Sequence, residues 1–395
     1  MTAKNYDLQV QPRYEEYVDK RNRKAKRWFD TRADKETRYT HFNEHKTATI
    51  DEKERWSIEL LKVALGRAER PVVSCSFGID SILTLYLVRK ALVELGRDPS
   101  DVDVIWNDTK NEFPAVRTYA KQLTEEWNLR LTVTAPKRSL KRIIDDNGGI
   151  DSSYFTARKG AREDGQPLSE KCCGTLKHEP MRRAKRENSW DCILVGLRAD
   201  ESSQRLLASL RDGEYFYSVK EWKAMVCRPI LWWTERDIWD YVERENIPYN
   251  DLYRQNMIKV YPDNTADIVA ANVDVLKEVG IDYQALADQQ LQTFTRRQSL
   301  VLKDLGFKMF TPRTGCMMCP IPIKYGYLQW MRTYYPKVYN AMIHSLGYGK
   351  ALLDMLPQEA KDEIKAMTGI DVTAEDAAER MKEILEAKPC TFDKF

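Results

Sequence analysis

The chain contains 395 residues, of which 43% are hydrophobic and 31% charged, and its formal net charge at pH 7 is +3. This composition excludes a disordered chain, and no apolar run approaches the roughly 18–20 residues needed to cross a bilayer. The near balance of charge gives no global field for nucleic acid, so any such contact would need a local patch. The segment from Met1 to Asp7 lacks the apolar core of a signal peptide, and we therefore expect a cytoplasmic protein with no membrane partner.

Residues 1–55 are polar and strongly charged, and we expect them to form a basic helical arm. Trp28 and Phe29 directly follow a basic run, which consists of Lys20, Arg21, Arg23, Lys24, Lys26 and Arg27. The simpler interpretation is a solvated helix that packs through its aromatic residues. The alternative is an arm that contacts the phosphates of a nucleic acid.

Strand and helix patterns alternate from about residue 56. An amphipathic pattern predicts a helix over 55–67, and another helix is predicted over 81–95. Short apolar runs predict strands at 72–77, 102–106, 131–134, 193–197 and 226–231. This alternation predicts an α/β fold, a doubly wound parallel sheet of about five strands that binds its ligands at the carboxyl ends of the strands.

The same patterns divide the chain into four segments. After the basic arm of residues 1–55, the nucleotide-binding α/β core would span 56–255. Residues 256–335 would form a helical insertion, with a helical stretch over about 266–305, and a Cys-x-x-Cys segment. Residues 336–395 would form a C-terminal helical region that is interrupted by glycine and proline.

The first predicted strand runs into a loop that is suited to binding phosphate. Its residues are Ser76-Phe77-Gly78-Ile79-Asp80-Ser81. A strand that turns into a helix directs backbone N–H groups and the positive end of the helix at an anion. No Gly-Lys-Ser/Thr follows, so this is not a Walker loop. The alternative interpretation is an ordinary junction in which Ser81 caps the helix.

This loop resembles the PP-loop, Ser-Gly-Gly-x-Asp-Ser, of the adenine nucleotide α-hydrolases, which cleave ATP between its α and β phosphates. Phe77 replaces the first glycine, and the Ser-Phe-Gly version is similar to the phosphoadenosine phosphosulfate (PAPS) reductase branch of that family. Further segments resemble motifs of the branch, namely 107–114, 171–180, 196–205 and 228–239. In the first of these segments, Lys110 replaces a glycine. The resemblance covers about residues 56–255 and returns at 312–335.

The resemblance implies which residues bind ATP and its Mg²⁺. The implied nucleotide-binding residues are Ser76, Phe77, Gly78, Ile79, Asp80, Ser81, Asp108, Thr109 and Gly196. The implied catalytic residues are Asp80, Ser81, Lys177, Arg198 and Arg205. The cations among them would neutralise phosphate oxygens, although a single arginine taken alone more often forms a surface ion pair. Residues 234–237 have the pattern of a helix start, which we assign to structure.

Four of the eight cysteines form two chelating pairs, namely Cys172 with Cys173 and Cys316 with Cys319. Four thiolates suit a 4Fe-4S cluster, while zinc and a redox dithiol are the alternatives. The arrangement resembles the cluster site of adenosine phosphosulfate (APS) reductases and of the ATP pyrophosphatases of DNA phosphorothioation. Three others lie in or beside predicted strands and are expected to be core thiols: Cys75, Cys192 and Cys227.

Two features decide between the activities that the resemblance implies. Reductases carry a Glu-Cys-Gly-x-His tail, of which only Cys390 has a counterpart here, and they often lack the Asp-Ser pair of the loop. We therefore expect an ATP pyrophosphatase that adenylates an acceptor for sulfur incorporation, similar to the DNA phosphorothioation enzymes. Its expected partners are ATP, DNA and a cysteine desulfurase or another sulfur-relay protein, and its oligomeric state is open.

Two alternative functions remain at this point. One is an APS or PAPS reductase that releases sulfite, with Cys390 as the nucleophile. The other is a non-catalytic subunit that binds a nucleotide or a cluster within a larger complex.

Overall fold

The structure is a computed structural model, and it describes residues 14–18, 22, 24–28, 32–150, 162–163, 166–167, 173–218, 222–317, 327–354 and 356–387. The chain divides into two compact units, each assembled from separate stretches of sequence. Unit 1 comprises residues 1–108, 114–135 and 179–250, and unit 2 comprises residues 109–113, 136–178 and 251–395. Among the described residues, no helix is long and apolar enough to cross a membrane.

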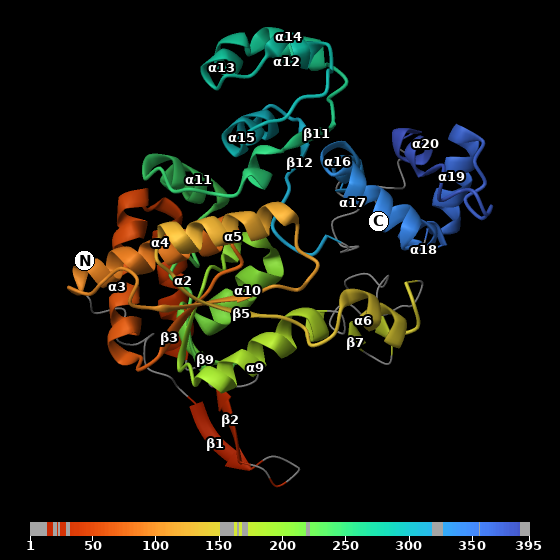
Figure 1. The fold of residues 1–395 in the computed structure, drawn as a ribbon. Helices are drawn as coiled ribbons and strands as arrows, with labels where there is room; N and C mark the ends of the chain where they lie inside the picture. Colours follow the sequence, from red (N-terminus) through yellow and green to blue (C-terminus); the bar gives the residue numbers. More distant parts are fainter. Residues whose placement is uncertain are drawn as a thin grey trace. The chain divides into compact units, whose positions relative to one another are not determined.

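Unit 1 is built around a six-stranded, mostly parallel sheet with helices packed on it (Figure 1). The strand order is β5-β4-β3-β8-β10-β9, and β9 runs antiparallel to β10. The strands are β3 (Pro71–Ser74), β4 (Asp103–Asn107), β5 (Arg130–Thr134), β8 (Cys192–Val195), β9 (Tyr215–Ser218) and β10 (Ala224–Cys227). The predicted α/β fold is therefore confirmed, and each predicted strand has its counterpart.

β9 is the strand that the sequence patterns did not predict. It contains only four residues, and it forms a hairpin with β10, in which Tyr217 pairs with Met225. A short edge strand of this kind needs no crossover helix, so the strand–helix alternation contains no signal for it.

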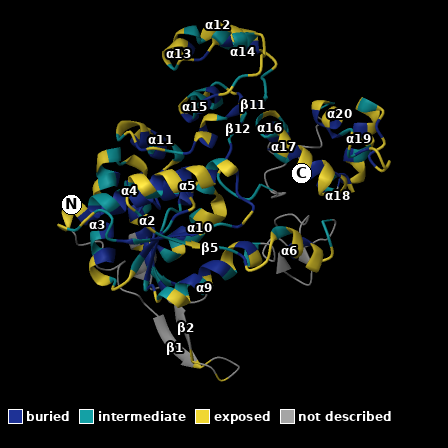
Figure 2. Ribbon diagram, viewed as in Figure 1, coloured by how far each residue is buried: buried dark blue, intermediate teal, exposed yellow. Residues whose placement is uncertain are grey.

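The helices of unit 1 cover the sheet and bury their apolar faces against it, which Figure 2 shows as dark blue ribbon. They are α2 (Arg32–Thr47), α3 (Ile50–Arg67), α4 (Ile79–Glu94), α5 (Pro114–Glu126), α9 (Glu179–Asn188), α10 (Ser203–Asp212) and α11 (Glu235–Arg244), with a 3₁₀ turn at Ala199–Glu201. α4 is buried over much of its surface, and its Ile82, Leu83 and Leu85 are fully buried. α11 starts with the capping box of Thr234 and Asp237, as its sequence predicts.

The N-terminal arm is only partly helical. β1 (Tyr14–Val18) and β2 (Lys24–Trp28) form an antiparallel pair, so the expected helix is wrong for this part of residues 1–55. Asn22 between the two strands has a φ of 55°, which asparagine tolerates better than most residues. α3 begins earlier than predicted, because Thr49 and Glu52 form a capping box ahead of it.

Unit 2 contains short helices and small two-stranded sheets. β11 (Met257–Val260) pairs with β12 (Lys308–Phe310), and β6 (Arg162–Glu163) pairs with β7 (Gln166–Pro167). The predicted helical stretch over 266–305 consists of α12 (Thr265–Ala271), α13 (Val273–Glu278), α14 (Tyr283–Ala287) and α15 (Arg296–Asp304). Their core includes the fully buried Leu276, Leu286 and Leu302.

Unit 2 also contains further short helices, and those from Pro336 onward agree with the helical region predicted there. In chain order they are α6 (Leu140–Asp146), a π-helix at Gly174–His178, a 3₁₀ turn at Asp251–Arg254, α16 (Tyr327–Tyr334), α17 (Pro336–Asn340), a π-helix at Ala341–Ser345, α18 (Tyr348–Asp354), α19 (Gln358–Thr368) and α20 (Met381–Ala387).

Candidate functional site

The predicted phosphate loop lies at the carboxyl end of β3, where the chain turns into α4. The Ser81 hydroxyl holds the loop together, because it donates to the Gly78 carbonyl at 2.9 Å and accepts from the Ser76 N–H at 3.1 Å. Ser81 is buried, whereas Ser76 is exposed at the mouth of the loop. Gly78 is the N-cap of α4 and provides no side-chain cap. The first N–H groups of a helix have no partner within the helix, so this end is suited to binding an anion.

Phe77 shapes the loop from inside the core. Its φ is 56°, in the left-handed region that favours glycine, and its side chain is fully buried. Its ring packs edge-on against Trp106 at 5.4 Å and against Tyr119 at 6.3 Å between centroids. Phe77 therefore anchors the loop to β4 and α5.

Asp80 and Arg198, both predicted to be catalytic, form an ion pair at the start of α4. The Arg198 Nε lies 2.6 Å from the Asp80 Oδ1, and its Nη1 lies 3.2 Å from the Asp200 Oδ2. The Arg198 side chain is 4% exposed, whereas that of Asp80 is 28% exposed. A buried guanidinium requires such partners, because an unpaired buried charge costs several kcal/mol. Arg198 is thus fixed beside the loop before any ligand arrives.

Gly196 and Arg205 complete the group that unit 1 brings together. A Cβ atom on Gly196 would lie 2.5 Å from the Asp80 carbonyl oxygen, so only glycine fits against the first turn of α4. Arg205 pairs with Glu201, which also accepts from the Arg198 N–H at 3.4 Å. Sequence analysis did not single out Glu201, although it lies in the quoted 196–205 segment.

Asp108, at the end of β4, is also in unit 1. Its N–H donates to the Thr134 carbonyl at 2.8 Å, and its carboxylate pairs with Arg117 at 3.0 Å. Thr109, the next residue, belongs to unit 2. The predicted binding role of these two residues stays a prediction.

Within unit 2, the segment 109–113 lies against Cys316, which is far away in the sequence. The Cys316 Sγ lies 3.6 Å from the Thr109 Oγ1, and the Met317 N–H donates to the Asn111 carbonyl at 2.7 Å. Thr109 is buried, and its hydroxyl donates to Glu112 at 2.7 Å. The predicted nucleotide-binding turn and the first cysteine of the Cys-x-x-Cys segment are therefore neighbours, which no sequence spacing indicated.

The cysteines divide into two groups by burial. Cys75, Cys192 and Cys227 are buried, as predicted for core thiols. Burial raises the pKa of Cys75 to about 11 and raises the pKa values of Cys192 and Cys227. Cys173 and Cys316 are partly exposed, and their role as cluster ligands stays a prediction.

The other cysteines of interest, Cys172, Cys319 and Cys390, lie outside the described residues. No group of three or more metal-binding side chains forms within the described ranges, which leave out two of the four predicted cluster ligands. Lys177 is exposed on the π-helix Gly174–His178 of unit 2, and its catalytic role stays a prediction.

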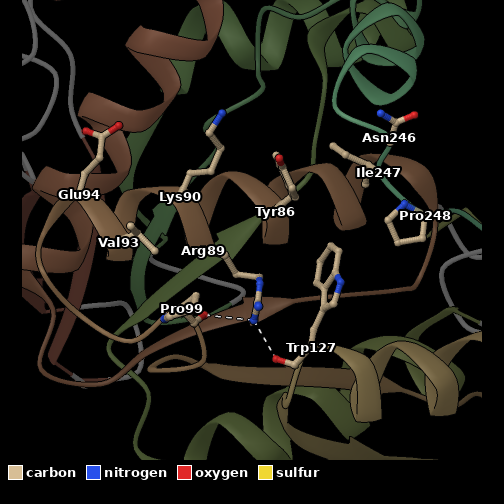
Figure 3. Close-up of a pocket in the computed structure, with 10 residues that line it drawn as sticks. All are labelled: Tyr86, Arg89, Lys90, Val93, Glu94, Pro99, Trp127, Asn246, Ile247 and Pro248. Atoms are coloured by element: carbon tan, nitrogen blue, oxygen red, sulfur yellow. Dashed lines mark hydrogen bonds between the residues drawn. The ribbon is translucent and has the colours of Figure 1, made fainter.

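A hollow of about 490 Å³ lies at the opposite end of α4 from the loop, and it contains none of the predicted site residues (Figure 3). Arg89 spans it, donating to the carbonyls of Pro99 at 3.3 Å and Trp127 at 2.8 Å. The guanidinium carbon of Arg89 also lies 5.0 Å from the centre of the Trp127 ring. Arg89 therefore links α4 to the chain at Pro99 and Trp127 across this hollow.

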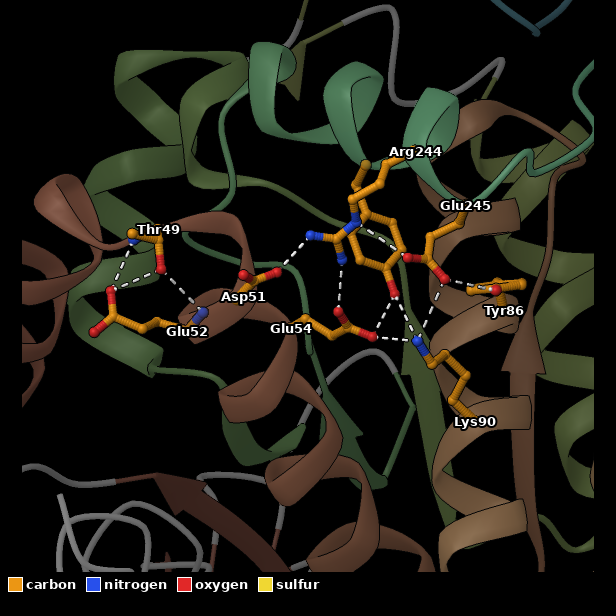
Figure 4. Close-up of polar contacts among 9 residues, drawn as sticks. Thr49, Asp51, Glu52, Glu54, Tyr86, Lys90, Arg244 and Glu245 are labelled. Atoms are coloured by element: carbon orange, nitrogen blue, oxygen red, sulfur yellow. Dashed lines mark hydrogen bonds and ion pairs between the residues drawn. The ribbon is translucent and has the colours of Figure 1, made fainter.

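An ion-pair network joins α3, α4 and α11 (Figure 4). Lys90 pairs with Glu54 and, at 3.4 Å, with Glu245. Arg244 pairs with Glu54 at 2.7 Å, and the Tyr241 hydroxyl donates to Glu54 at 2.6 Å. The network fixes the far end of α4 and thereby the direction of its N-terminus.

The parallel sheet, the loop at its carboxyl edge and the paired Arg198 define an enzyme of the adenine nucleotide α-hydrolase type. Residues 70–322 match the family model described as the phosphoadenosine phosphosulfate reductase domain, and the chain belongs to this family.

Curated relatives are similar over half of the chain. The phosphoadenosine 5′-phosphosulfate reductase of Xylella fastidiosa is 33% identical over 196 residues, which are 49% of this chain and 70% of the relative. That of Xanthomonas campestris pv. campestris is 28% identical over 218 residues, which are 54% of this chain and 76% of the relative.

Solved structures are more distant. A PAPS reductase from Candida auris in a phosphate complex has a TM-score of 0.37 and 21% identity, covering 51% of this chain and 88% of that one. A tRNA thiolase from Methanococcus maripaludis with its 4Fe-4S cluster has a TM-score of 0.35 and 13% identity, covering 64% of this chain and 78% of that one.

Proposed function

We propose that the chain is an ATP pyrophosphatase, which converts ATP to AMP and pyrophosphate and adenylates an acceptor for sulfur incorporation. The observation that carries the proposal is Asp80 in the first turn of α4, at the carboxyl end of β3 and 2.6 Å from Arg198. A carboxylate at this place suits a Mg²⁺ ion that is bound to pyrophosphate oxygens. A sulfonucleotide has no β,γ-pyrophosphate and needs no such acid.

In the proposed reaction, an acceptor oxygen attacks the α-phosphorus of ATP, the bond to the bridging oxygen breaks and pyrophosphate leaves. A sulfur nucleophile then displaces AMP from the adenylated acceptor. The loop N–H groups and the start of α4 bind phosphate oxygens, and Arg198 and Arg205 offset the negative charge that develops on them. Arg198 is already held by two acids, so little reorganisation is needed. Asp80 would hold a Mg²⁺ ion together with phosphate oxygens, and this ion would supply further charge neutralisation.

The donor set of the chain also fits a 4Fe-4S cluster on Cys172, Cys173, Cys316 and Cys319. Two thiols of this set, Cys173 and Cys316, are partly exposed, whereas the cysteines outside it that the structure describes are buried. When bound, the cluster supplies redox or sulfur-carrying chemistry. We propose DNA as the acceptor and a cysteine desulfurase or another sulfur-relay protein as the donor, on the basis of the resemblance of this cysteine pattern to the phosphorothioation enzymes.

The test compares two variants that each remove one acid from Arg198. Asp80→Ala should reduce Mg²⁺-dependent release of pyrophosphate from ATP by at least about 100-fold, because its acid is at the phosphate site. Asp200→Ala removes the other partner of Arg198, which lies outside the loop, and should reduce the rate by less than about threefold. Both proteins are purified anaerobically, and their iron content is recorded. Equal losses in the two variants would mean that Asp80 only supports Arg198.

A PAPS reductase is the second candidate, because the curated relatives carry that name and one is 33% identical. In this case PAPS with a thiol reductant gives sulfite, and Cys390→Ser abolishes the release. Sulfite release without pyrophosphate release would replace the first proposal by the second.

A further inference from the structure

Unit 1 has a second hollow, of about 610 Å³, at the amino edge of the sheet. It lies between the C-terminal half of α9, the start of β8 and the start of β10. Its lining includes the cations Lys185, Arg186 and Lys223 together with Ser189 and Tyr217. The phosphate loop follows the carboxyl end of β3, which runs parallel to β8, so the hollow is at the opposite edge of the sheet.

The three cations are not neutralised by neighbouring acids. Across the residues that the structure describes, no acidic side chain forms an ion pair with them, whereas Arg183 on the same helix pairs with Glu179 at 2.7 Å. Lys185 and Arg186 also have no acid three or four positions away in α9. The Lys185 Nζ instead donates to the Lys223 carbonyl at 3.2 Å, so the Lys185 side chain lies against the backbone of Lys223.

The one acid in the lining is directed at other partners. Both oxygens of the Asp191 carboxylate accept backbone N–H groups, from Glu69 at 2.8 Å and from Arg70 at 2.9 Å. Three cations against the single negative charge of Asp191 leave a local positive potential, although the chain as a whole is nearly neutral. A ligand with several negative oxygens would neutralise that potential.

The shape of the hollow favours a strand over a single nucleotide. Arg186, Ser189 and Lys223 are exposed, so the site is open to solvent along its rim. The Trp190 ring is 1% exposed and cannot stack on a base. Tyr217, the other ring in the lining, is partly exposed, and the three cations are the groups suited to the phosphates of a nucleic-acid backbone.

We propose that this basic hollow, defined by Lys185, Arg186 and Lys223, binds the phosphodiester backbone of a nucleic acid. The inference adds a nucleic-acid contact to the proposed function, in which DNA is the acceptor, but it does not rest on ATP cleavage, since the hollow is away from the phosphate loop and binding requires no ATP. If ATP cleavage fails in the experiment above, backbone binding is still expected, and the reverse also holds.

The test is fluorescence anisotropy of a labelled DNA strand with the full chain, without ATP. Three phosphate contacts predict that raising the salt from about 50 to about 200 mM weakens binding of a single strand by about 20-fold. The triple variant Lys185→Gln, Arg186→Gln, Lys223→Gln should bind at least about 10-fold more weakly at the lower salt, with a flatter salt dependence. Assayed without DNA, its pyrophosphate release from ATP should be unchanged.

A matched control removes the same charge elsewhere. Lys121→Gln, Lys337→Gln, Lys350→Gln changes three exposed lysines outside the hollow and should alter binding by less than about twofold. The charge-retaining variant Lys185→Arg, Lys223→Arg should bind like the wild type and shows that the fold tolerates substitution there. Equal losses in the two triple variants would overturn the proposal, as would equally tight binding of polyglutamate or of AMP.

Discussion

Phe77 and Lys110 both have left-handed backbone, at the two positions where related motifs carry glycine. Their φ angles are 56° and 59°. An L-residue in this conformation costs about 1–2 kcal/mol, so glycine suits these positions because of the backbone rather than because a ligand comes close. Burial of the Phe77 ring offsets that cost, since its side chain is 0% exposed. Phe77 and Lys110 therefore differ from the glycines of the related motifs in side chain but keep a left-handed backbone.

Because of this backbone conformation, the glycine variant at position 77 should be more stable than the alanine variant, which is the reverse of the usual order. Phe77→Ala should lower the free energy of unfolding by about 3–5 kcal/mol, because it leaves a cavity beside Trp106. Phe77→Gly leaves a similar cavity but relieves the backbone strain, and it should be about 1 kcal/mol more stable than the alanine variant. Urea denaturation measures both values. A glycine variant less stable than the alanine variant would contradict a strained loop.

Gly196 permits the close contact between the end of β8 and the first turn of α4. Gly196→Ala places a Cβ atom 2.5 Å from the Asp80 carbonyl oxygen, so one backbone segment has to move. Since the Asp80 carboxylate and the helix N-terminus move with it, ATP should bind at least about 10-fold more weakly in a calorimetric titration. The control is Gly66→Ala at the end of α3, where nothing lies within 4 Å. It should leave ATP binding unchanged and stabilise the chain by about 0.5–1 kcal/mol.

Among the elements, those with strong local signals were predicted and those that depend on distant partners were not. β3 and α11 have an apolar run and a capping pattern of their own. The helical stretch expected at 266–305 is confirmed, but its breaks at Asn272 and Gly280 were not predicted, and Gly280 has a φ of 71°. β9 depends on pairing with β10, and sequence periodicity contains no information about that pairing.

α2 is attached to the rest of unit 1 by buried histidines, to which the sequence analysis assigned no role. The His41 Nδ1 lies 3.2 Å from the Glu214 Oε2, and the His45 Nδ1 lies 2.8 Å from the His41 carbonyl. Burial lowers the pKa of His41, but its hydrogen bond and charge contact with Glu214 outweigh burial and raise it above 6.5. At His45 burial dominates, and the pKa lies below 6.5.

The two histidines should therefore give pH effects of opposite sign. His41 contributes stability below pH 6.5 and loses it as the pH rises through its raised folded value. His41→Gln should thus cost more free energy of unfolding at about pH 5.5 than at about pH 8.5. His45 opposes folding when it becomes protonated, so His45→Gln should cost less at the lower pH. Urea denaturation at the two pH values measures both, and effects of the same sign would contradict the assigned contacts.

For the whole molecule, the main finding is that each unit is discontinuous in sequence. The break at residue 250 lies near the boundary predicted at 255, but residues 109–113 belong with residues 251–395. This short segment carries Phe113 into the aromatic core of unit 2, where its ring lies 5.4 Å from Trp330 and 5.0 Å from Tyr335. Composition and periodicity can delimit only contiguous segments. The assignment of residues 109–113 to unit 2 was therefore not predictable from one sequence.

Phe113 therefore tests whether the units have separate cores. Phe113 is 1% exposed, and Phe113→Ala should destabilise unit 2 by about 3–5 kcal/mol. In hydrogen-exchange mass spectrometry, amides of α16 and α17 should exchange faster in this variant, while those of α4 are unchanged. Leu85→Ala, at a fully buried position of α4, is the reciprocal control and should accelerate exchange in unit 1 only. If either variant accelerates exchange equally in both units, the chain unfolds as one cooperative body and the division into two cores is wrong.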